Sequence, residues 1–237
     1  MQVFYILYQY LIAFPLSILL TLFTAVTTML FFPCKNTRWL HAIQAFWCRS
    51  CCHLVFLPVS VDGLENISPD QSYVFVANHL STYDVFVVYG WLPNIFKWLI
   101  KKEIRYIPFV GTACKAAGHI FVDRKNIRSG AKSILAAEKA LQGGVSTVIF
   151  PEGTRSENGE VGPFKRGAFH IAHQLNLPVV PISLTGLLEV MPKGAWYVHR
   201  HPVHMHIGKP INLKDYQEEN EAMEAVRQAV IEGCAKH

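Results

Sequence analysis

Residues 73–84 read YVFVANHLSTYD. The apolar run Tyr73 to Ala77 predicts a buried strand, and the polar residues after it predict a loop at the end of that strand. His79 and Asp84 lie in this loop with four residues between them. Catalytic groups are commonly placed in loops that leave the ends of buried strands. The stretch therefore predicts a core strand and a candidate histidine–aspartate pair.

The chemistry of such a pair is specific. An imidazole titrates near neutral pH, and a carboxylate bonded to one ring nitrogen fixes the tautomer, so the other nitrogen can accept a proton from a hydroxyl. His79 and Asp84 fit these roles without a serine or cysteine nucleophile. Two alternatives stay open: a loop histidine beside a helix-capping aspartate, or a pair of metal ligands, although no second ligand group lies nearby in the sequence.

A second apolar strand ends in the motif FPEGTRS at residues 150–156. Its proline and glycine suit a tight turn, which leaves backbone N–H groups, the hydroxyl of Thr154 and the guanidinium of Arg155 available to an anion. A guanidinium matches a phosphate through two parallel, charge-assisted hydrogen bonds. The motif therefore predicts an anion site. The alternative is an ordinary turn in which Glu152 pairs with Arg155 in solvent.

A third block, GHIFVDR at residues 118–124, also ends an apolar strand in charge, and its alternative is an exposed Asp–Arg pair. A fourth, VPI, stands at residues 180–182. In order and spacing, the four blocks resemble the motifs of the glycerolipid acyltransferases, most nearly those of the 1-acyl-glycerol-3-phosphate acyltransferases. The resemblance covers about residues 58–215 and implies that the protein is an enzyme.

The resemblance implies roles for individual residues. His79 would act as general base and Asp84 would orient it, with Lys101 or Lys102 as a candidate donor to the developing oxyanion. The residues expected to contact substrate are Lys101, Lys102, Arg124, Glu152, Gly153, Thr154 and Arg155. No metal or other cofactor is implied.

The same resemblance implies the substrates. The donor would be acyl-CoA or acyl carrier protein, and the acceptor a lysophospholipid, with the sn-2 hydroxyl of 1-acyl-glycerol-3-phosphate converted to phosphatidic acid. Glycerol-3-phosphate and other lysolipids are alternative acceptors. Two other classes remain: a membrane-anchored lipid-binding module, which intact catalytic residues disfavour, and a phosphate-ester hydrolase that holds a metal on His79 and Asp84.

Composition fits one catalytic domain with a membrane element. The chain has 237 residues, of which 51% are hydrophobic and 16% charged, with a formal net charge of +5. This charge suits an anionic membrane face or acidic substrates, and nothing resembles a nucleic-acid module. We predict a membrane element at residues 1–57 and an acyltransferase domain at 58–237. The cysteines lack disulfide or zinc spacing and predict buried, reduced thiols.

The membrane prediction rests on the N-terminus. Phe4 to Phe32 contains no charged residue, and Pro15 to Phe32 would extend about 27 Å as a helix, close to the thickness of a bilayer core. Aromatic residues crowd its first half, as in an interfacial belt. Basic residues follow it, so the positive-inside rule places the catalytic domain on the cytosolic face, which is the inner membrane in a bacterium. Whether the element spans the bilayer or inserts in one leaflet stays open.

A second helix is predicted from Thr37 to Val55. Its apolar face would carry Trp39, Leu40, Ile43, Phe46, Trp47, Cys51 and Leu54, and its other positions Arg38, His41, Gln44, Arg49 and His53. Such a helix lies in the membrane interface, or its apolar face packs on the catalytic domain.

The remaining sequence alternates strands and helices, which predicts an α/β domain with a mixed central sheet flanked by helices. The expected strands are 59–61, 73–77, 96–99, 119–122, 147–150, 179–183 and 203–207. The expected helices are 107–117, 128–142, 167–175 and 218–235. Histidines at 199, 201, 204 and 206 are interpreted as partly exposed strand residues, since the sequence shows no carboxylate or cysteine to complete a metal site.

Overall fold

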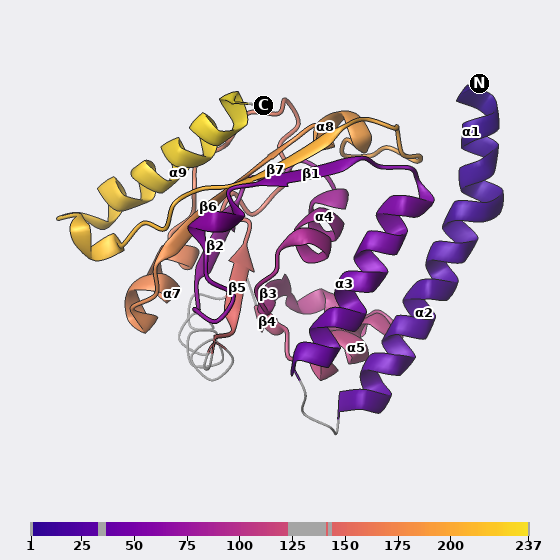
Figure 1. Ribbon diagram of the computed structural model, residues 1–237, viewed down its shortest axis with the longest axis horizontal. Coiled ribbons are helices and arrows are strands. Elements are labelled where there is room, and N and C mark those ends of the chain that lie inside the picture. Colours follow the sequence, from indigo (N-terminus) through magenta and orange to yellow (C-terminus); the bar gives the residue numbers. More distant parts are fainter. Residues whose placement is uncertain (1, 33–36, 123–140, 142–143, 237) are drawn as a thin grey trace.

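The computed structural model describes residues 2–32, 37–122, 141 and 144–236. Within these residues a seven-stranded sheet has the order β1-β7-β6-β2-β5-β3-β4 (Figure 1). The strands are β1 Val59–Asp62, β2 Val74–Ala77, β3 Phe96–Lys101, β4 Ile120–Val122, β5 Ser146–Ile149, β6 Val179–Thr185 and β7 Val203–Ile207. The predicted mixed α/β class is confirmed, and each expected strand lies within two residues of its predicted ends.

Strand direction determines where the functional loops lie. β2 pairs in parallel with β5 and β6, and β3 pairs in parallel with β5 and β4. β7 is antiparallel to β6, and β1 is parallel to β7. The carboxyl ends of β2 to β6 therefore meet at one edge of the sheet, which is where open α/β sheets usually place their sites.

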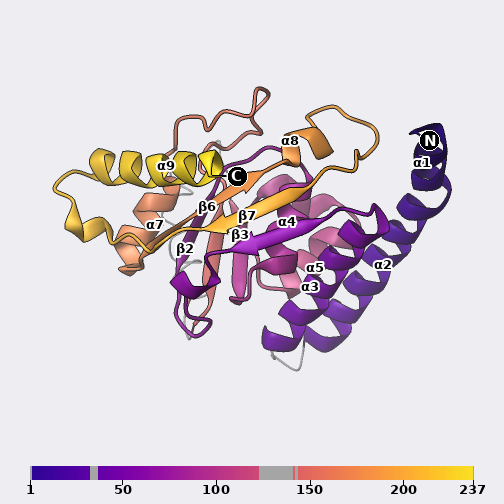
Figure 2. The same cartoon turned by 45° about the horizontal axis from the view of Figure 1, so that its top comes forward.

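Helices cover both faces of the sheet (Figures 1 and 2). One face is covered by α4 Tyr83–Trp91, α5 Val110–Ala116 and the N-terminal helices, and the other by α7 Gly167–Leu175 and α9 Glu219–Ala235. Alternate residues of β2 enter two different cores: Phe75 packs with the first group, and Val74 with the second. Burial on both faces explains why β2 is apolar without alternation.

Three helices differ from prediction, and one of them is the short α8 Leu187–Val190, which was not expected. α5 begins at Val110 instead of residue 107, because Pro108 precedes it and Phe109 has a φ of 61°, outside the helical region. Helix α4 was not predicted, since its sequence is apolar on all sides. Of the helix expected at 128–142, every residue except Leu141 lies outside the described residues.

The N-terminus forms one long helical run. α1 Gln2–Tyr8 continues through the π-helical turn η1 Gln9–Ala13 into α2 Phe14–Phe31. Among the described residues, this 30-residue run is long and apolar enough to cross a membrane by length and composition. Within its most apolar 18-residue stretch, 22% of the residues are buried in the protein. The exposed large apolar side chains of the run are Val3, Phe4, Leu7, Tyr10, Leu11, Ile12, Leu16, Ile18, Leu19, Leu22, Phe23, Val26, Leu30 and Phe31.

Helix α3, Thr37–Leu54, packs against both α2 and α4. The predicted division of its faces is seen only in part. His41 and Gln44, expected on the polar side, are buried, whereas Trp39 and Phe46 are exposed. His41 and Gln44 are buried because both contact Tyr89 of α4. The His41 ring stacks on the Tyr89 ring with centroids 4.9 Å apart, and the Tyr89 hydroxyl donates to the Gln44 side chain.

The same helix supplies thiols to the main core. Cys48, Cys51 and Cys52 are free and buried, as predicted, and burial raises the pKa of the Cys51 thiol to about 11. A thiol with a raised pKa is a poor nucleophile at neutral pH. α3 thus shares a core with the predicted catalytic domain, and the division of the chain at residue 57 stays a prediction.

We expect His41 to make the fold sensitive to acid. Burial lowers the pKa of His41 to about 4, and the positive charge of Lys97 adds to the effect. The unfolded chain takes up this proton near pH 6.5, so the protein should lose roughly 2–3 kcal/mol as pH falls from 6.5 to 4. His41→Phe keeps a ring beside Tyr89 and should flatten this part of the profile. An unchanged slope in denaturation at several pH values would refute the assignment.

Candidate active site

The loop after β2 is anchored by Asn78. This buried side chain donates from Nδ2 to the carbonyl oxygen of Leu184 at 2.9 Å and accepts from the Leu184 N–H at 2.8 Å. Leu184 belongs to β6, so the Asn78 amide continues the pairing between β2 and β6 beyond the end of the strand. The chain therefore leaves the sheet at a defined point, and His79 is the next residue.

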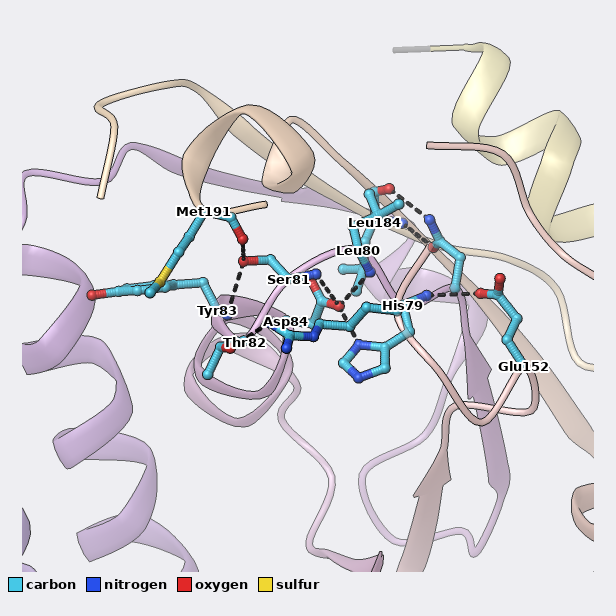
Figure 3. A network of polar contacts seen from close by, with 11 residues as sticks. His79, Leu80, Ser81, Thr82, Tyr83, Asp84, Glu152, Leu184 and Met191 are labelled. Atoms are coloured by element: carbon cyan, nitrogen blue, oxygen red, sulfur yellow. Dashed lines mark hydrogen bonds and ion pairs between the residues drawn. The ribbon is translucent and has the colours of Figure 1, made fainter. Parts of the chain in front are cut away.

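His79 and Asp84 form a close pair (Figure 3). Nδ1 of His79 lies 2.5 Å from Oδ2 of Asp84, in the first turn of α4. The same oxygen accepts the N–H groups of Leu80 at 2.7 Å and Ser81 at 2.9 Å. Complete burial raises the pKa of Asp84, while these hydrogen bonds act in the opposite direction. With Nδ1 donating to the carboxylate, Nε2 is the nitrogen that can accept a proton.

An aromatic stack holds the plane of the imidazole. The Phe150 ring lies 4.1 Å from the His79 ring with an interplanar angle of 11°. The Trp98 ring of β3 also stacks on Phe150, with ring centroids 5.4 Å apart. The His79 side chain keeps 20% exposure, so the ring is fixed yet open to a ligand. Orientation of the base thus comes from Asp84 at one nitrogen and from Phe150 across its face.

Glu152 has a different place from the one expected. Its Oε1 accepts the N–H of His79 at 2.9 Å, and its Oε2 accepts the N–H of Gly162 at 2.9 Å. The residue is only 8% exposed. A buried carboxylate already paired with two backbone donors suits the joining of two loops, and its charge would repel a phosphate. The geometry therefore does not support direct contact between Glu152 and an anionic acceptor.

The rest of the motif lies beside the histidine loop. Gly153 has a φ of 76°, and a Cβ there would be 2.6 Å from Nζ of Lys165. Arg155 donates from Nη1 to the hydroxyl of Thr82 at 3.0 Å, and Thr154 is exposed. Lys165 was not among the predicted site residues. Its place in the run FKRGAF, which follows the motif after a short loop, is the sequence signal that was available.

The other predicted cations are at the same sheet edge or outside the described residues. Lys101 ends β3, two strands from β2, and its Nζ lies 3.9 Å from Glu103. Lys102 begins the 3₁₀ turn η4, Lys102–Tyr106. Arg124 lies outside the described residues. Lys97 is on the buried face of β3, where it donates to the carbonyl of Ala117 at 2.6 Å.

The histidines of the C-terminal strand have a carboxylate partner that was not foreseen. Asp62 of β1 accepts from Nε2 of His204 at 3.0 Å and from Nδ1 of His206 at 2.8 Å. Parallel pairing of β1 with β7 brings them together across more than 140 residues. In the part of the chain that the structure describes, no group of three or more histidine, cysteine, aspartate or glutamate residues is arranged to hold a metal ion.

Comparisons with known proteins agree with this geometry. The sequence profile of the Acyltransferase family matches residues 58–185. The chain is 36% identical to the chloroplastic 1-acyl-sn-glycerol-3-phosphate acyltransferase BAT2 of Brassica napus over 185 residues, which are 77% of this chain and 53% of that protein. It is 41% identical to the human 1-acyl-sn-glycerol-3-phosphate acyltransferase alpha over 136 residues, 56% of this chain and 47% of that one. It spans about half the length of these curated relatives.

A solved structure matches nearly the whole fold. The crystal structure of the 1-acyl-sn-glycerophosphate (LPA) acyltransferase PlsC from Thermotoga maritima superposes with a TM-score of 0.76 at 26% identity. The match covers 95% of this chain and 97% of that one. The resemblance drawn from the four motifs is confirmed.

Glu152→Gln tests the joining role of Glu152. An amide retains one oxygen, so one of the two buried N–H groups would lose its acceptor, at a cost of about 1–3 kcal/mol. We expect that loss in the unfolding free energy, measured by denaturation in detergent. Glu160→Gln is the matched control, because Glu160 is exposed and its carboxylate accepts from the Asn158 side chain at 2.8 Å. Equal effects of the two substitutions would contradict the role.

Proposed function

The chain belongs to the acyltransferase family, and from that membership we propose that it acylates the sn-2 hydroxyl of 1-acyl-glycerol-3-phosphate, giving phosphatidic acid. The donor is a thioester, acyl-CoA or acyl carrier protein. The observation that carries the proposal is the His79–Asp84 pair at the sheet edge, beside the loop that bears Arg155. The names of the relatives support the same reaction.

In this proposal His79 is the general base. Its Nε2 takes the proton of the acceptor hydroxyl while that oxygen bonds to the thioester carbonyl carbon. Asp84 holds the ring and stabilises the imidazolium that results. The tetrahedral intermediate then collapses, the carbon–sulfur bond breaks, and the imidazolium returns its proton to the thiolate. The products are an ester and a free thiol, and no covalent enzyme intermediate is required.

Cationic side chains stabilise two different negative charges, the acceptor phosphate and the developing oxyanion. Arg155, with Thr154, binds the acceptor phosphate, and Lys165 adds a second positive charge next to Gly153. The Gly153 N–H already donates to the Phe150 carbonyl at 3.1 Å, so Gly153 contributes by forming the turn. Lys101 or Lys102 stabilises the developing oxyanion from the end of β3. Arg124 stays a predicted phosphate contact. Glu152 acts on this site by joining the loop that bears Arg155 to the backbone of His79.

The membrane supplies acceptor and receives product. Both lipids carry acyl chains, and each methylene withdrawn into water costs about 0.8 kcal/mol. The exposed apolar side of α1 and α2, together with Trp39 and Phe46 of α3, suits contact with lipid. We propose that the enzyme works at the membrane, with its catalytic part on the cytosolic face. Insertion in one leaflet fits best, because Gln9 and Tyr10 of η1 bond to the backbone of the catalytic part at Val198 and Trp196.

Removal of the base tests the mechanism. His79→Ala should lower turnover about 10²-fold or more, because proton transfer loses its acceptor. Asp84→Asn should also impair turnover severely, since the ring loses its charged partner. The assay offers purified protein labelled acyl-CoA and acyl carrier protein with a panel of lysolipids and glycerol-3-phosphate. Near-normal turnover in folded His79→Ala would exclude this mechanism.

Arg155→Ala tests the phosphate site. Loss of a charge-assisted pair should lower kcat/KM for the phosphorylated acceptor roughly tenfold to a hundredfold and leave the donor KM nearly unchanged. Arg166→Ala is the control, because this exposed arginine bonds instead to Asn220 at 3.1 Å. A change confined to the donor KM would reassign Arg155 to the thioester carrier.

A further inference from the structure

The loop Met191–His199, which we call the clasp loop, connects two distant parts of the protein. It follows α8 Leu187–Val190 and leads toward β7. Its base is closed by the His199 N–H, which donates to the Val190 carbonyl at 2.8 Å. In both views the chain between α8 and β7 extends toward α1 (Figures 1 and 2).

Gln9 attaches the clasp loop to the N-terminal helix. Its Nε2 donates to the carbonyl of Val198 at 2.7 Å, and its Oε1 accepts the Val198 N–H at 2.8 Å. Both residues are fully buried. A polar side chain within an apolar helix is costly to bury unless it is fully hydrogen-bonded, and here both ends of the amide have partners.

The helix is locally distorted at this contact. Gln9 begins the π-helical turn η1, and turns of this kind inside α-helices are often found at functional sites. The next residue, Tyr10, donates its hydroxyl to the carbonyl of Trp196 at 3.0 Å. Two successive side chains of the N-terminal helix therefore bond to the backbone of the clasp loop.

The other end of the clasp loop meets the catalytic loop (Figure 3). The hydroxyl of Ser81 donates to the Met191 carbonyl at 2.8 Å. Ser81 is fully buried, and its N–H is one of the two backbone groups that donate to Asp84. A chain of hydrogen-bonded and covalent links thus runs from Gln9 through the clasp loop to the partner of His79.

Simple docking of the helix does not require Gln9. The hydroxyls of Tyr5 and Tyr8 donate to the carbonyls of Val55 and Leu54, at 2.6 and 2.9 Å. These contacts hold α1 against the end of α3 and do not involve the clasp loop. Tyr8→Phe is therefore a matched control that removes a docking bond from the same helix.

We infer that Gln9 is a positioning residue: through the clasp loop it holds Ser81, and thereby the His79–Asp84 pair, in the geometry for reaction. The position of the N-terminal helix and the orientation of the His79 ring are then physically linked. The predicted effect on kcat rests on the proposed acyl transfer. The link between Gln9 and Ser81 can also be measured without activity, by hydrogen–deuterium exchange.

The kinetic test compares Gln9→Met with Tyr8→Phe and Trp196→Ala on acceptor in liposomes. Gln9→Met keeps the length of the side chain and removes both hydrogen bonds, so we expect kcat to fall roughly tenfold with KM within about twofold, since buried backbone groups lose their partners. Trp196→Ala keeps the carbonyl that Tyr10 uses. Both controls should stay within about twofold, and all variants should sediment with liposomes.

A double-mutant cycle locates the link. If the clasp loop connects the two ends, Ser81→Ala should lower kcat less in the Gln9→Met background than in the wild type. Full additivity of the two effects would overturn the inference. Should Gln9→Met fold poorly, Gln9→Asn replaces it, because the shorter amide remains polar but cannot reach Val198 in the same way.

Hydrogen–deuterium exchange tests the link without turnover. The amides of Leu80 and Ser81 should exchange faster in Gln9→Met and at the wild-type rate in Tyr8→Phe. If wild-type protein transfers no acyl group, the proposed function fails and this measurement still decides the inference. Unchanged exchange in folded Gln9→Met, or an equal change in Tyr8→Phe, would overturn it.

Discussion

The buried carboxylate of Asp84 is the constraint on which the site depends. A charge removed from water needs hydrogen-bond donors, and here the imidazole of His79 and two backbone N–H groups converge on Oδ2, while Oδ1 is buried without a partner among the described residues. Their convergence leaves the loop after β2 little conformational freedom. Asn78 at one end and α4 at the other then connect this arrangement to the sheet, so the reactive nitrogen has a defined direction before any substrate binds.

Much of this was predictable because the signals are local. A strand buried on both faces is a continuous apolar run, so β2 was identified, and a strand end followed by His-x4-Asp identified the pair. α7 was predicted with its observed ends, since Gly167 opens it and Asn176 ends it in the left-handed conformation. The order of the motifs in the sequence also indicates the family.

The misses have a common cause, which is long-range pairing. The place of Asp62 between two histidines depends on β1 pairing with β7, and the burial of His41 depends on rings contributed by α4 and β3. Glu152 was expected to contact substrate because it belongs to the motif that the family resemblance assigns to the acceptor phosphate. Its backbone partners become visible only when residues 79 and 162 are placed in space. Periodicity cannot identify contacts of that kind.

The strand order also carries a consequence for biosynthesis. β2 pairs with β5, which follows it by about seventy residues, and with β6, which follows it by more than a hundred. β1 can pair only after β7, near the C-terminus, has been synthesised. A ribosome therefore releases the apolar N-terminal helices long before the sheet can close over them. During that interval the apolar surface of these helices is exposed to water. Early delivery of the nascent chain to a bilayer would protect it from aggregation until the last strand has been synthesised.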